Sequence, residues 1–472
     1  MGKHRVVIVG SGFGGLFAAR NLASEDVEII LLSDTTHHLF QPLLYQVATG
    51  ILSEGEIAPS TREILKRQKN VKVLLGTVED IDPESQQVIW RHYGQKRATR
   101  YDTLILAAGV GQSYFGNDQF ATFAPGMKSI DDALELRARI FRAFEQAEVS
   151  DDPEEIQKLL TFVVVGAGPT GVEMAGQIRE LSSNTLPKEF RNIDTTKARV
   201  ILVEGGSQPL PSFGSKLGEV TLQDLRELGV EFLGNTLVTD IGPDTVTVRD
   251  KDGNEQLIPS VCKVWAAGVQ GPPIAKVLSE RTGVQLDRAG RVLVEPDLSV
   301  EGYPNVYVVG DMMSLEGVPG VAQGAIQGAR FVTRRLKDLL AGRDPSDVTF
   351  SYNDKGSMAT IARSKAVASI GPVNLHGFPA WLAWSFLHVL YITGFKSRVS
   401  TLFHWAVSFA SNARSERTTT NQQMVGRLAL DHLGERVSSL LIKGASPEEI
   451  LVRAMDLEQL DYERAEEANK GR

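Results

Sequence analysis

Gly10, Gly12 and Gly15 form a G-x-G-x-x-G pattern, with Phe13 and Gly14 between the last two glycines. In a dinucleotide-binding loop the first glycine allows a tight turn and the second lets the backbone approach a pyrophosphate. The third lets a helix pack on a strand. The N-terminus of that helix then faces the phosphates. Because glycine-rich turns also occur in other α/β proteins, the elements around the pattern must decide its meaning.

Those elements are arranged as the chemistry requires. The apolar run of residues 6–9 predicts a buried strand before the glycines, residues 16–22 predict a helix after them, and residues 27–32 predict a second strand. Together they make a βαβ unit of about thirty residues. Ser33 and Asp34 follow the second strand, and either could hold the ribose hydroxyls of a bound dinucleotide.

A second copy of the arrangement begins at residue 160. A buried strand leads into Gly166, Gly168, Pro169, Thr170 and Gly171, and the sequence predicts a helix over residues 172–181. Two dinucleotide fingerprints in one chain predict one resident and one diffusible dinucleotide. If these are FAD and NADH, a hydride passes from the nicotinamide to the flavin.

Glu204 ends the strand of residues 200–203 and is the candidate ribose acid of the second site, the alternative being a solvated loop carboxylate. No Lys or Arg occurs in residues 205–208. Since a carboxylate repels a 2′-phosphate, we expect NADH to be preferred over NADPH.

Short strand-and-glycine patterns follow each unit and return the chain to its nucleotide domain. They end in Ala108–Gly109 and in Ala267–Gly268. A third strand, within residues 305–311, ends in Gly310 and Asp311. Asp311 could bind a cofactor hydroxyl at the end of a parallel sheet, or it could cap a helix.

The composition narrows the function further. The chain has 472 residues, a net charge of −8 and one cysteine, Cys262. One thiol excludes an intrachain disulfide, a cysteine-rich zinc site and a dithiol relay, and no metal site is expected. The acidic balance makes nucleic acid an unsuitable partner.

Together, these motifs resemble the flavoproteins with two dinucleotide-binding domains. Within that superfamily the chain is similar to the type II NADH:quinone oxidoreductases, the NADH dehydrogenases that pump no protons, and especially to actinobacterial members. The likeness extends over about residues 5 to 415. Three stretches carry it: residues 38–50, residues 166–175, and the A-Q-x-A-x-Q pattern of residues 322–327.

The resemblance implies FAD and NADH as cofactors, menaquinone as the acceptor, and a role for each matching residue. FAD would contact the first glycine motif, Gln41, Pro42, Leu43, Gly310 and Asp311, with Ala322 at the start of the quinone-site pattern. NADH would contact the second motif and Glu204, and Glu173 would lie near the nicotinamide and quinone.

Gln323 and Gln327 are four residues apart, so on a helix they share one face and could bind a quinone carbonyl. Two solvated glutamines are the alternative. For Glu173 the alternative is a carboxylate stabilised at a helix N-terminus. His37 and His38 are interpreted as loop packing beside the flavin rather than as acid–base groups.

The cysteine count also separates branches of the superfamily. Disulfide reductases and sulfide:quinone enzymes need more than one thiol, and Cys262 lies in the NADH half, where a buried structural role is expected. Electrons would then leave the flavin directly. The alternative function is a non-respiratory NADH-binding flavoprotein that acts as a redox sensor or scaffold, similar to the apoptosis-inducing-factor branch.

Residues 366–395 contain no charged side chain. Glycines and prolines interrupt the first half, so we expect two short apolar helices, at residues 380–395 and 399–413, that enter one leaflet of the membrane. Tryptophans and flanking cations favour that interface. A buried dimer interface is the alternative, and both could hold.

The expected fold class is therefore α/β, with two Rossmann-like dinucleotide-binding domains and a C-terminal helical membrane-anchoring region. We expect a homodimer, peripheral on the cytoplasmic face of the cell membrane and in contact with the lipids of its inner leaflet. The expected domains are residues 1–155 (FAD, first part), 156–290 (NADH), 291–368 (FAD, second part, with the quinone-site helix), 369–415 (membrane anchor) and 416–472 (charged helical tail).

Overall fold

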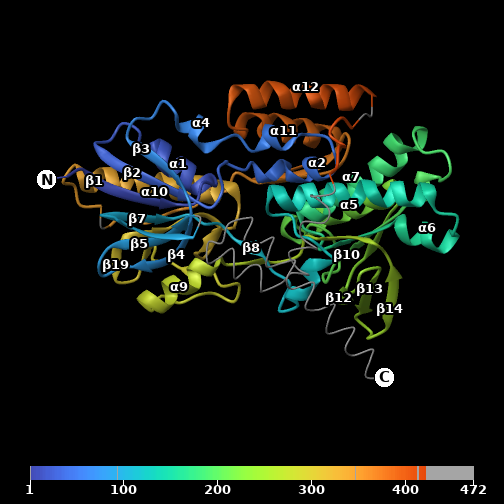
Figure 1. Cartoon of the computed structure of the whole chain (residues 1–472), viewed down its shortest axis with the longest axis horizontal. Helices are drawn as coiled ribbons and strands as arrows, with labels where there is room; N and C mark the ends of the chain where they lie inside the picture. Colours follow the sequence, from blue (N-terminus) through green and yellow to red (C-terminus); the bar gives the residue numbers. More distant parts are fainter. Residues whose placement is uncertain (1, 93, 346, 412–413, 421–472) are drawn as a thin grey trace, which may run out of the picture.

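The chain forms two α/β units joined by a pair of adjacent segments, with a C-terminal layer on one side (Figure 1). The computed structural model describes residues 2–92, 94–345, 347–411 and 414–420. Most of the charged helical tail expected at residues 416–472 lies outside the described residues.

The first unit is built on a six-stranded sheet in the order β18-β19-β7-β1-β2-β3, parallel except for β18. Helices α1 and α10 pack on each other beside it. The bounds are β1 His4–Val9, α1 Phe13–Asn21, β2 Val27–Ser33, α2 Leu44–Ala48, α3 Glu54–Ile57, α4 Thr61–Leu65, β3 Val71–Leu75, β7 Thr103–Leu106, α9 Pro273–Thr282, β17 Val292–Leu293, β18 Ser299–Val300, β19 Tyr303–Val308, β20 Met313–Ser314 and α10 Ala322–Leu340.

The second unit repeats the plan on a four-stranded parallel sheet, in the order β11-β10-β9-β15. Its elements are α5 Ile130–Val149, α6 Pro153–Leu159, β9 Thr161–Val165, α7 Pro169–Glu180, β10 Arg199–Val203, α8 Ser215–Leu228, β11 Val230–Leu233 and β15 Cys262–Trp265. In each unit a three-stranded antiparallel sheet is inserted before the returning strand. The inserts are β4 Thr77–Asp82, β5 Gln87–His92 and β6 Gln95–Arg100, and β12 Thr236–Ile241, β13 Thr245–Asp250 and β14 Glu255–Pro259.

The two connections between the units run side by side, because β8 (Gly111–Gln112) pairs with β16 (Val269–Gln270). Helix α5 starts at a capping box, in which the Ser129 hydroxyl accepts from the N–H of Asp132. Although the expected boundary at residue 155 would assign α5 to the first unit, its Phe144 stacks on Phe162 of β9. Helix α5 thus packs on the sheet of the second unit.

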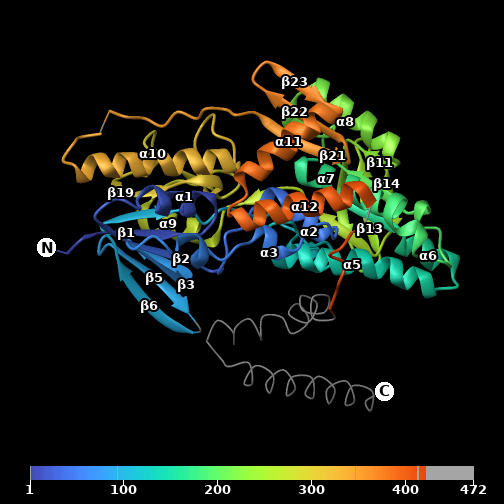
Figure 2. The same cartoon turned by 90° about the horizontal axis from the view of Figure 1, so that it is seen from above.

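The C-terminal layer consists of the hairpin sheet β21 (Ser357–Ala362), β22 (Lys365–Ile370) and β23 (Val373–His376), followed by α11 (Gly377–Tyr391) and α12 (Phe395–Ser411). Strand β21 packs on α7, so closely that a Cβ at Gly176 would lie 1.7 Å from the carbonyl oxygen of Ile361. Residue 368, the expected boundary, lies inside β22, which pairs with β21. Figure 2 shows α11 and α12 lying across α2 and α7.

Helix α11 starts at Gly377, three residues before the expected start, because Pro379 lies in its first turn, where a missing N–H costs nothing. None of the described helices is both long and apolar enough to cross a bilayer.

Candidate functional site

A long groove runs along the carboxyl ends of β1, β2, β7 and β19 in the first unit. It consists of two adjoining cavities of about 400 and 360 Å³. Gly12, Ala107, Gly109, Lys128 and Asp311 line both cavities, so the two form one continuous space. The carboxyl ends of parallel strands are where α/β sheets bind ligands, and an elongated groove there suits a dinucleotide.

The three glycines of the first motif differ in what surrounds them. Gly10 has φ +99°, which favours glycine, and a Cβ at Gly15 would lie 1.8 Å from the carbonyl oxygen of Gly10. A Cβ at Gly12 would meet nothing within 4 Å. Gly10 and Gly15 thus serve the turn and the packing of α1, whereas Gly12 faces the open groove. This cradle of bare backbone at a helix N-terminus fits a pyrophosphate.

The acidic and hydroxyl candidates lie at strand ends along the groove. The Ser33 hydroxyl is buried and 2.9 Å from that of Ser11, while Asp34 is exposed, and both residues line the groove. Asp311 follows β19 in a 3₁₀ turn and caps no described α-helix, since α10 begins only at Ala322. Burial raises the pKa of the Asp311 carboxyl, and Lys128 opposes that shift.

Most residues predicted for the flavin site line this groove. They are Gly10, Gly12, Phe13, Gly14, Ser33, Asp34, Gln41, Pro42, Ala108, Gly109, Gly310, Asp311 and Ala322. Leu43 does not line it: its side chain is fully buried in the core. Lys128, Met127, Met358 and His388 also line the groove, although no sequence motif marks them.

The second glycine motif has the same geometry as the first. Gly166 has φ +94°, a Cβ at Gly171 would lie 1.8 Å from the Gly166 carbonyl oxygen, and a Cβ at Gly168 would be unobstructed. Glu204 is held at the end of β10, where its two oxygens accept from the N–H groups of Ala167 (2.7 Å) and Gly206 (2.8 Å). The backbone thus fixes the position of this half-exposed carboxylate.

Ala267 and Gly268 follow β15 at the crossing between the units. The side-chain amide of Gln112 donates to the carbonyl oxygens of both residues, at 2.6 and 2.8 Å. The returning strand of the second unit is thus bonded to the outgoing strand of the first.

The start of α7, which follows the second glycine motif, reaches the groove of the first unit, whereas Gly166, Gly168 and Gly171 themselves do not line it. Pro169, Thr170 and Glu173 of α7 line the groove of the first unit. Glu173 is the fifth residue of α7 and lies beyond the first turn, so the alternative of a carboxylate stabilised at the helix N-terminus is wrong. Its carboxyl is buried and accepts from the N–H of Thr360 at 3.4 Å. Burial raises the pKa of Glu173 well above its ordinary value, which favours the protonated acid.

Helix α10 places its predicted glutamines differently from its alanines. Ala322 and Ala325 line the groove. Gln327 instead binds the backbone of Asn353, donating to its carbonyl oxygen at 2.9 Å and accepting from its N–H at 3.0 Å. Gln323, one turn earlier on the same face, is half-buried.

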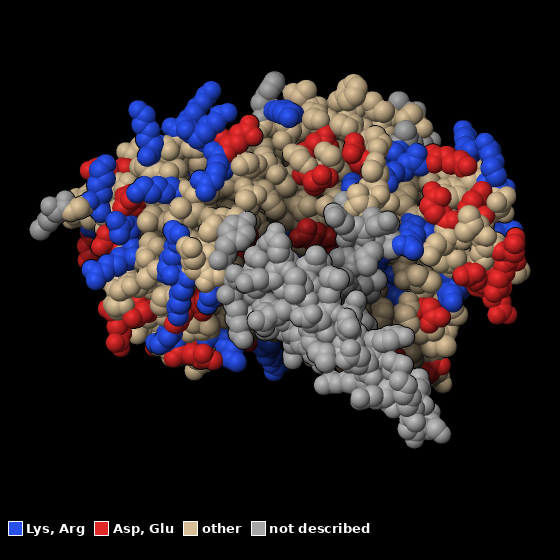
Figure 3. Space-filling model, viewed as in Figure 1, with Lys and Arg blue, Asp and Glu red and all other residues tan. Residues whose placement is uncertain are grey.

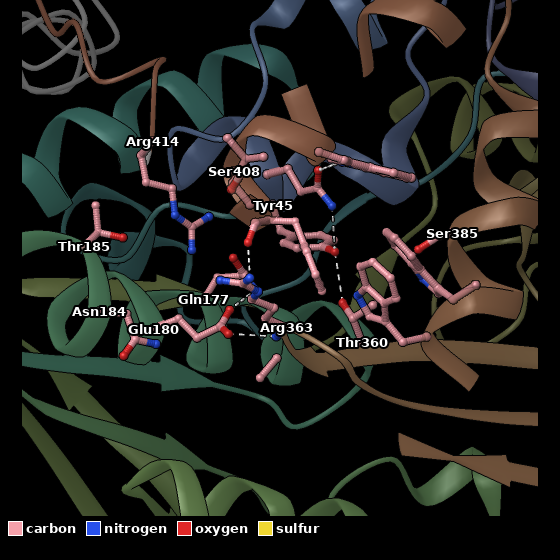
Figure 4. Close-up of a pocket in the computed structure, with 17 residues that line it drawn as sticks. Tyr45, Gln177, Glu180, Asn184, Thr185, Thr360, Arg363, Ser385, Ser408 and Arg414 are labelled. Atoms are coloured by element: carbon pink, nitrogen blue, oxygen red, sulfur yellow. Dashed lines mark hydrogen bonds between the residues drawn. The ribbon is translucent and has the colours of Figure 1, made fainter. Parts of the chain in front are cut away.

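A second cavity lies beneath α11 and α12 (Figure 4). Aromatic side chains of these helices form one wall, including Trp381, Trp384, Trp405 and Phe409. Four buried polar atoms of lining residues have no hydrogen-bond partner among the described residues: Gln177 Oε1, Trp384 Nε1, Ser385 Oγ and Arg414 Nη1. Since buried polar groups are normally paired, this concentration points to a polar ligand.

Only a thin wall separates this cavity from the groove. Tyr45 lines both spaces. Trp384 lines the cavity and stacks on His388, which lines the groove, with ring centroids 4.1 Å apart. The Tyr45 hydroxyl lies 2.9 Å from that of Thr360 and accepts from Gln46 at 3.0 Å.

The cavity also holds buried charge. Glu180 accepts from Gln177 and from the N–H of Arg363, each at 2.7 Å, and burial raises the pKa of its carboxyl. The guanidinium of Arg414 points into the same space, and burial lowers its pKa while Glu180 opposes that shift (Figure 4). Among the described residues no cluster of three His, Cys, Asp or Glu side chains could hold a metal ion.

Known proteins match the chain over most of its length. The pyridine nucleotide-disulphide oxidoreductase family matches residues 4–329. The type II NADH:quinone oxidoreductase Ndh of Mycobacterium tuberculosis is 59% identical over 434 residues, which cover 92% of this chain and 94% of that protein. NdhA of the same organism, also named a type II NADH:quinone oxidoreductase, is 54% identical over 93% of this chain and 94% of its own length.

Two solved structures share the fold. NDH2 from Plasmodium falciparum in complex with NADH superimposes with a TM-score of 0.82 at 20% identity, covering 88% of this chain and 99% of that chain. The sulfide:quinone oxidoreductase of Aquifex aeolicus superimposes with a TM-score of 0.68 at 19% identity, covering 86% and 94%. At such identities the likeness concerns architecture alone.

Proposed function

Because the chain belongs to the pyridine nucleotide-disulphide oxidoreductase family and to its type II NADH:quinone oxidoreductases, we propose that it oxidises NADH and reduces a membrane quinone. The overall reaction is NADH + H⁺ + quinone → NAD⁺ + quinol. The observation that carries the proposal is that the start of α7, directly after the second glycine motif, lines the groove of the first motif, with a polar cavity directly behind Tyr45.

The first motif, Ser33 or Asp34, and Asp311 would hold FAD in the groove, with Gln41 and Pro42 along its wall. FAD supplies the chemistry that couples a hydride donor to the acceptor. Gly166, Gly168, Gly171 and Glu204 would hold NADH, with Ala267 and Gly268 beside them. Because the fixed carboxylate of Glu204 repels a 2′-phosphate, it favours NADH over NADPH.

We place the quinone headgroup in the cavity beneath α11 and α12. Its carbonyls would satisfy the unpartnered donors of Trp384, Ser385 and Arg414, and its ring would pack on the aromatic wall. The raised pKa values of Glu173 and Glu180 favour carboxylic acids, which can supply protons to the quinol oxygens. Gln323 and Gln327 are the rival placement proposed from sequence, and the bonds of Gln327 to Asn353 weigh against it.

We propose the remaining features on the resemblance and on the exposed apolar faces of α11 and α12. Phe386 and Phe403 are 68% and 67% exposed. These faces would lie in the cytoplasmic leaflet as a monotopic anchor, next to the entrance for a lipid-phase quinone. Menaquinone as the acceptor and a homodimer remain predictions.

The test measures the two half-reactions separately in three variants. Trp384→Phe removes the unpartnered indole N–H. Because one hydrogen bond contributes about 1 kcal/mol, we expect the KM for the quinone to rise about fivefold. The rate at which NADH reduces the flavin in stopped-flow traces should not change. Gln327→Ala should leave the quinone KM unchanged. Trp90→Phe, in β5 of the first unit, is the matched control.

A rise in KM for Gln327→Ala but not for Trp384→Phe would move the quinone to α10. Wild-type protein that is reduced by NADH but turns over with no quinone analogue would instead favour the redox-sensor function.

A further inference from the structure

A wide groove lies between α4 and the turn that joins α11 to α12, with a volume of about 1160 Å³. It lies outside the sites assigned above. Arg20, at the end of α1, lines one side with Lys66 and Arg67, at the end of α4, while Lys396 in the first turn of α12 lines the other. All four side chains are exposed.

The charges in this groove are unbalanced. Arg20, Lys66, Arg67 and Lys396 form no ion pair with any described residue. Figure 3 shows Lys and Arg side chains gathered over α4, next to the uncharged surface of α11 and α12. Since the chain as a whole carries a net charge of −8, this local excess of cations is not a consequence of composition.

The two acids of the groove do not neutralise it. Glu56 is buried and accepts from the Ser400 hydroxyl at 2.5 Å and contacts His404 at 2.8 Å, so its charge serves to fasten α12 to α3. Glu63 is the other. Arg398 donates to the carbonyl oxygens of Leu390 and Ile392, both at 2.8 Å, and holds the turn in shape.

An apolar surface borders the cations. Leu390 and Tyr391 line the groove, and the exposed side chains of Leu387, Leu402 and Phe403 continue from it along α11 and α12. A ligand that matches both features needs an anionic head and a hydrocarbon tail. Nucleic acid and acidic peptides lack the tail. A second copy docked across a two-fold axis would bring two sets of cations together.

We propose that this groove binds the phosphate headgroup of an anionic phospholipid, whose acyl chains lie along α11 and α12. Arg20, Lys66, Arg67 and Lys396 contact the phosphate diester, and the attraction sets the orientation of the enzyme on the leaflet. The inference rests on the proposed attachment of α11 and α12 to a lipid surface.

The test compares binding of the full flavin-loaded chain to vesicles of phosphatidylcholine alone and of equimolar phosphatidylglycerol and phosphatidylcholine. Each cation near an anionic surface strengthens binding about fivefold. We therefore expect the combined variant Lys66→Ala, Arg67→Ala and Lys396→Ala to lose roughly a hundredfold of the preference for phosphatidylglycerol. Its binding to phosphatidylcholine should not change.

Two further combined variants serve as controls. Lys251→Ala, Lys276→Ala and Arg288→Ala remove the same charges from exposed positions in the β13–β14 turn and around α9, away from α12, and should behave as wild type. Lys66→Arg, Arg67→Lys and Lys396→Arg preserve the charge and should retain the preference.

If the alanine variant keeps the wild-type preference for phosphatidylglycerol, the groove does not bind the lipid headgroup. The same conclusion holds if the monomer–dimer equilibrium of that variant changes while its preference for phosphatidylglycerol does not. Failure of the wild type to bind either vesicle would overturn the membrane attachment itself.

Discussion

Single residues in the two glycine motifs carry separable roles. Gly15 and Gly171 are needed because a Cβ would collide with backbone inside the protein, whereas Gly12 and Gly168 face open space.

Cys262 is equally informative. Its thiol is buried, and burial raises its pKa to about 12, so it is a poor thiolate under ordinary conditions. This chain therefore shares its fold with a sulfide:quinone oxidoreductase, but its single cysteine does not suit thiol chemistry.

We predict that Gly12→Ala folds normally but binds FAD at least about tenfold more weakly, because its Cβ would occupy the space of the pyrophosphate. Gly12 has φ −66°, so alanine strains no backbone. Absorbance of the flavin relative to protein after dialysis measures the loss, with circular dichroism as the check on folding.

Gly168→Ala, with φ −68°, is the matched variant. It should keep its flavin and show a higher KM for NADH. Equal flavin loss in the two variants would show that the motifs do not hold different dinucleotides.

Among the helices, α7, α11 and α12 line the groove or the cavity in ways that their sequences alone do not reveal. Helix α7 carries the second glycine motif at its start and the buried acids Glu173 and Glu180 further on, so it borders both the groove and the cavity. Helices α11 and α12 turn aromatic side chains toward the cavity and other apolar side chains outward. A pattern that is apolar on nearly every face does not distinguish these two sides.

We predict that Phe386→Ser with Phe403→Ser lowers binding to neutral vesicles at least about tenfold, since a buried phenylalanine contributes about 1.5–3 kcal/mol. Reduction of the flavin by NADH should be unaffected. Vesicle co-sedimentation measures the binding. Leu237→Ser with Leu257→Ser changes two residues of similar exposure, 64% and 60%, on the antiparallel insert and should have no effect. Unchanged binding by the phenylalanine variant would argue for a dimer interface on this face.

For the whole molecule, buried titratable groups couple stability to pH. His38 is buried beside Phe13, bonded to the carbonyl oxygen of Ser11, and His388 lies in α11. Burial lowers the pKa of each to about 4. The buried acids Glu173 and Glu180 have the opposite shift. The contribution of these two acids to the free energy of unfolding is present at acidic pH and is lost as the pH rises through their raised pKa values.

We predict that the contribution of His38 and His388 to the free energy of unfolding falls between about pH 6.5 and pH 4, because the unfolded chain binds protons there that the two native histidines do not bind, whereas Glu173 and Glu180 act in the opposite direction. Each histidine contributes a loss of roughly 3 kcal/mol across that window. Urea midpoints at about pH 7 and pH 5 measure it.

Relative to the wild type, His38→Asn should lose less stability when the pH falls from about 7 to about 5, whereas His376→Asn, at an exposed histidine, should lose as much as the wild type. An identical pH dependence in both variants would contradict the assignment to buried His38.

Much of the nucleotide-binding plan can be read from the sequence. Both βαβ units, their glycine turns and the strand-end residues Glu204 and Asp311 are where the patterns predict, because each depends on side chains within one short stretch of chain. Local backbone conformation and the periodicity of apolar residues carry that information. The domain boundaries expected near residues 155 and 368 stay predictions, because a boundary depends on contacts between distant segments, such as that of Phe144 with Phe162, which no local pattern contains.

Only the tertiary structure brings together Lys128, Met358 and His388 in the groove, or Gln177, Trp384 and Arg414 around the cavity. These side chains come from segments far apart in the chain, and no spacing rule links them. The same packing buries Glu173 and directs Gln327 to Asn353. Burial and the pairing of polar atoms depend on which distant segments meet, and that decides which side chains remain available for chemistry.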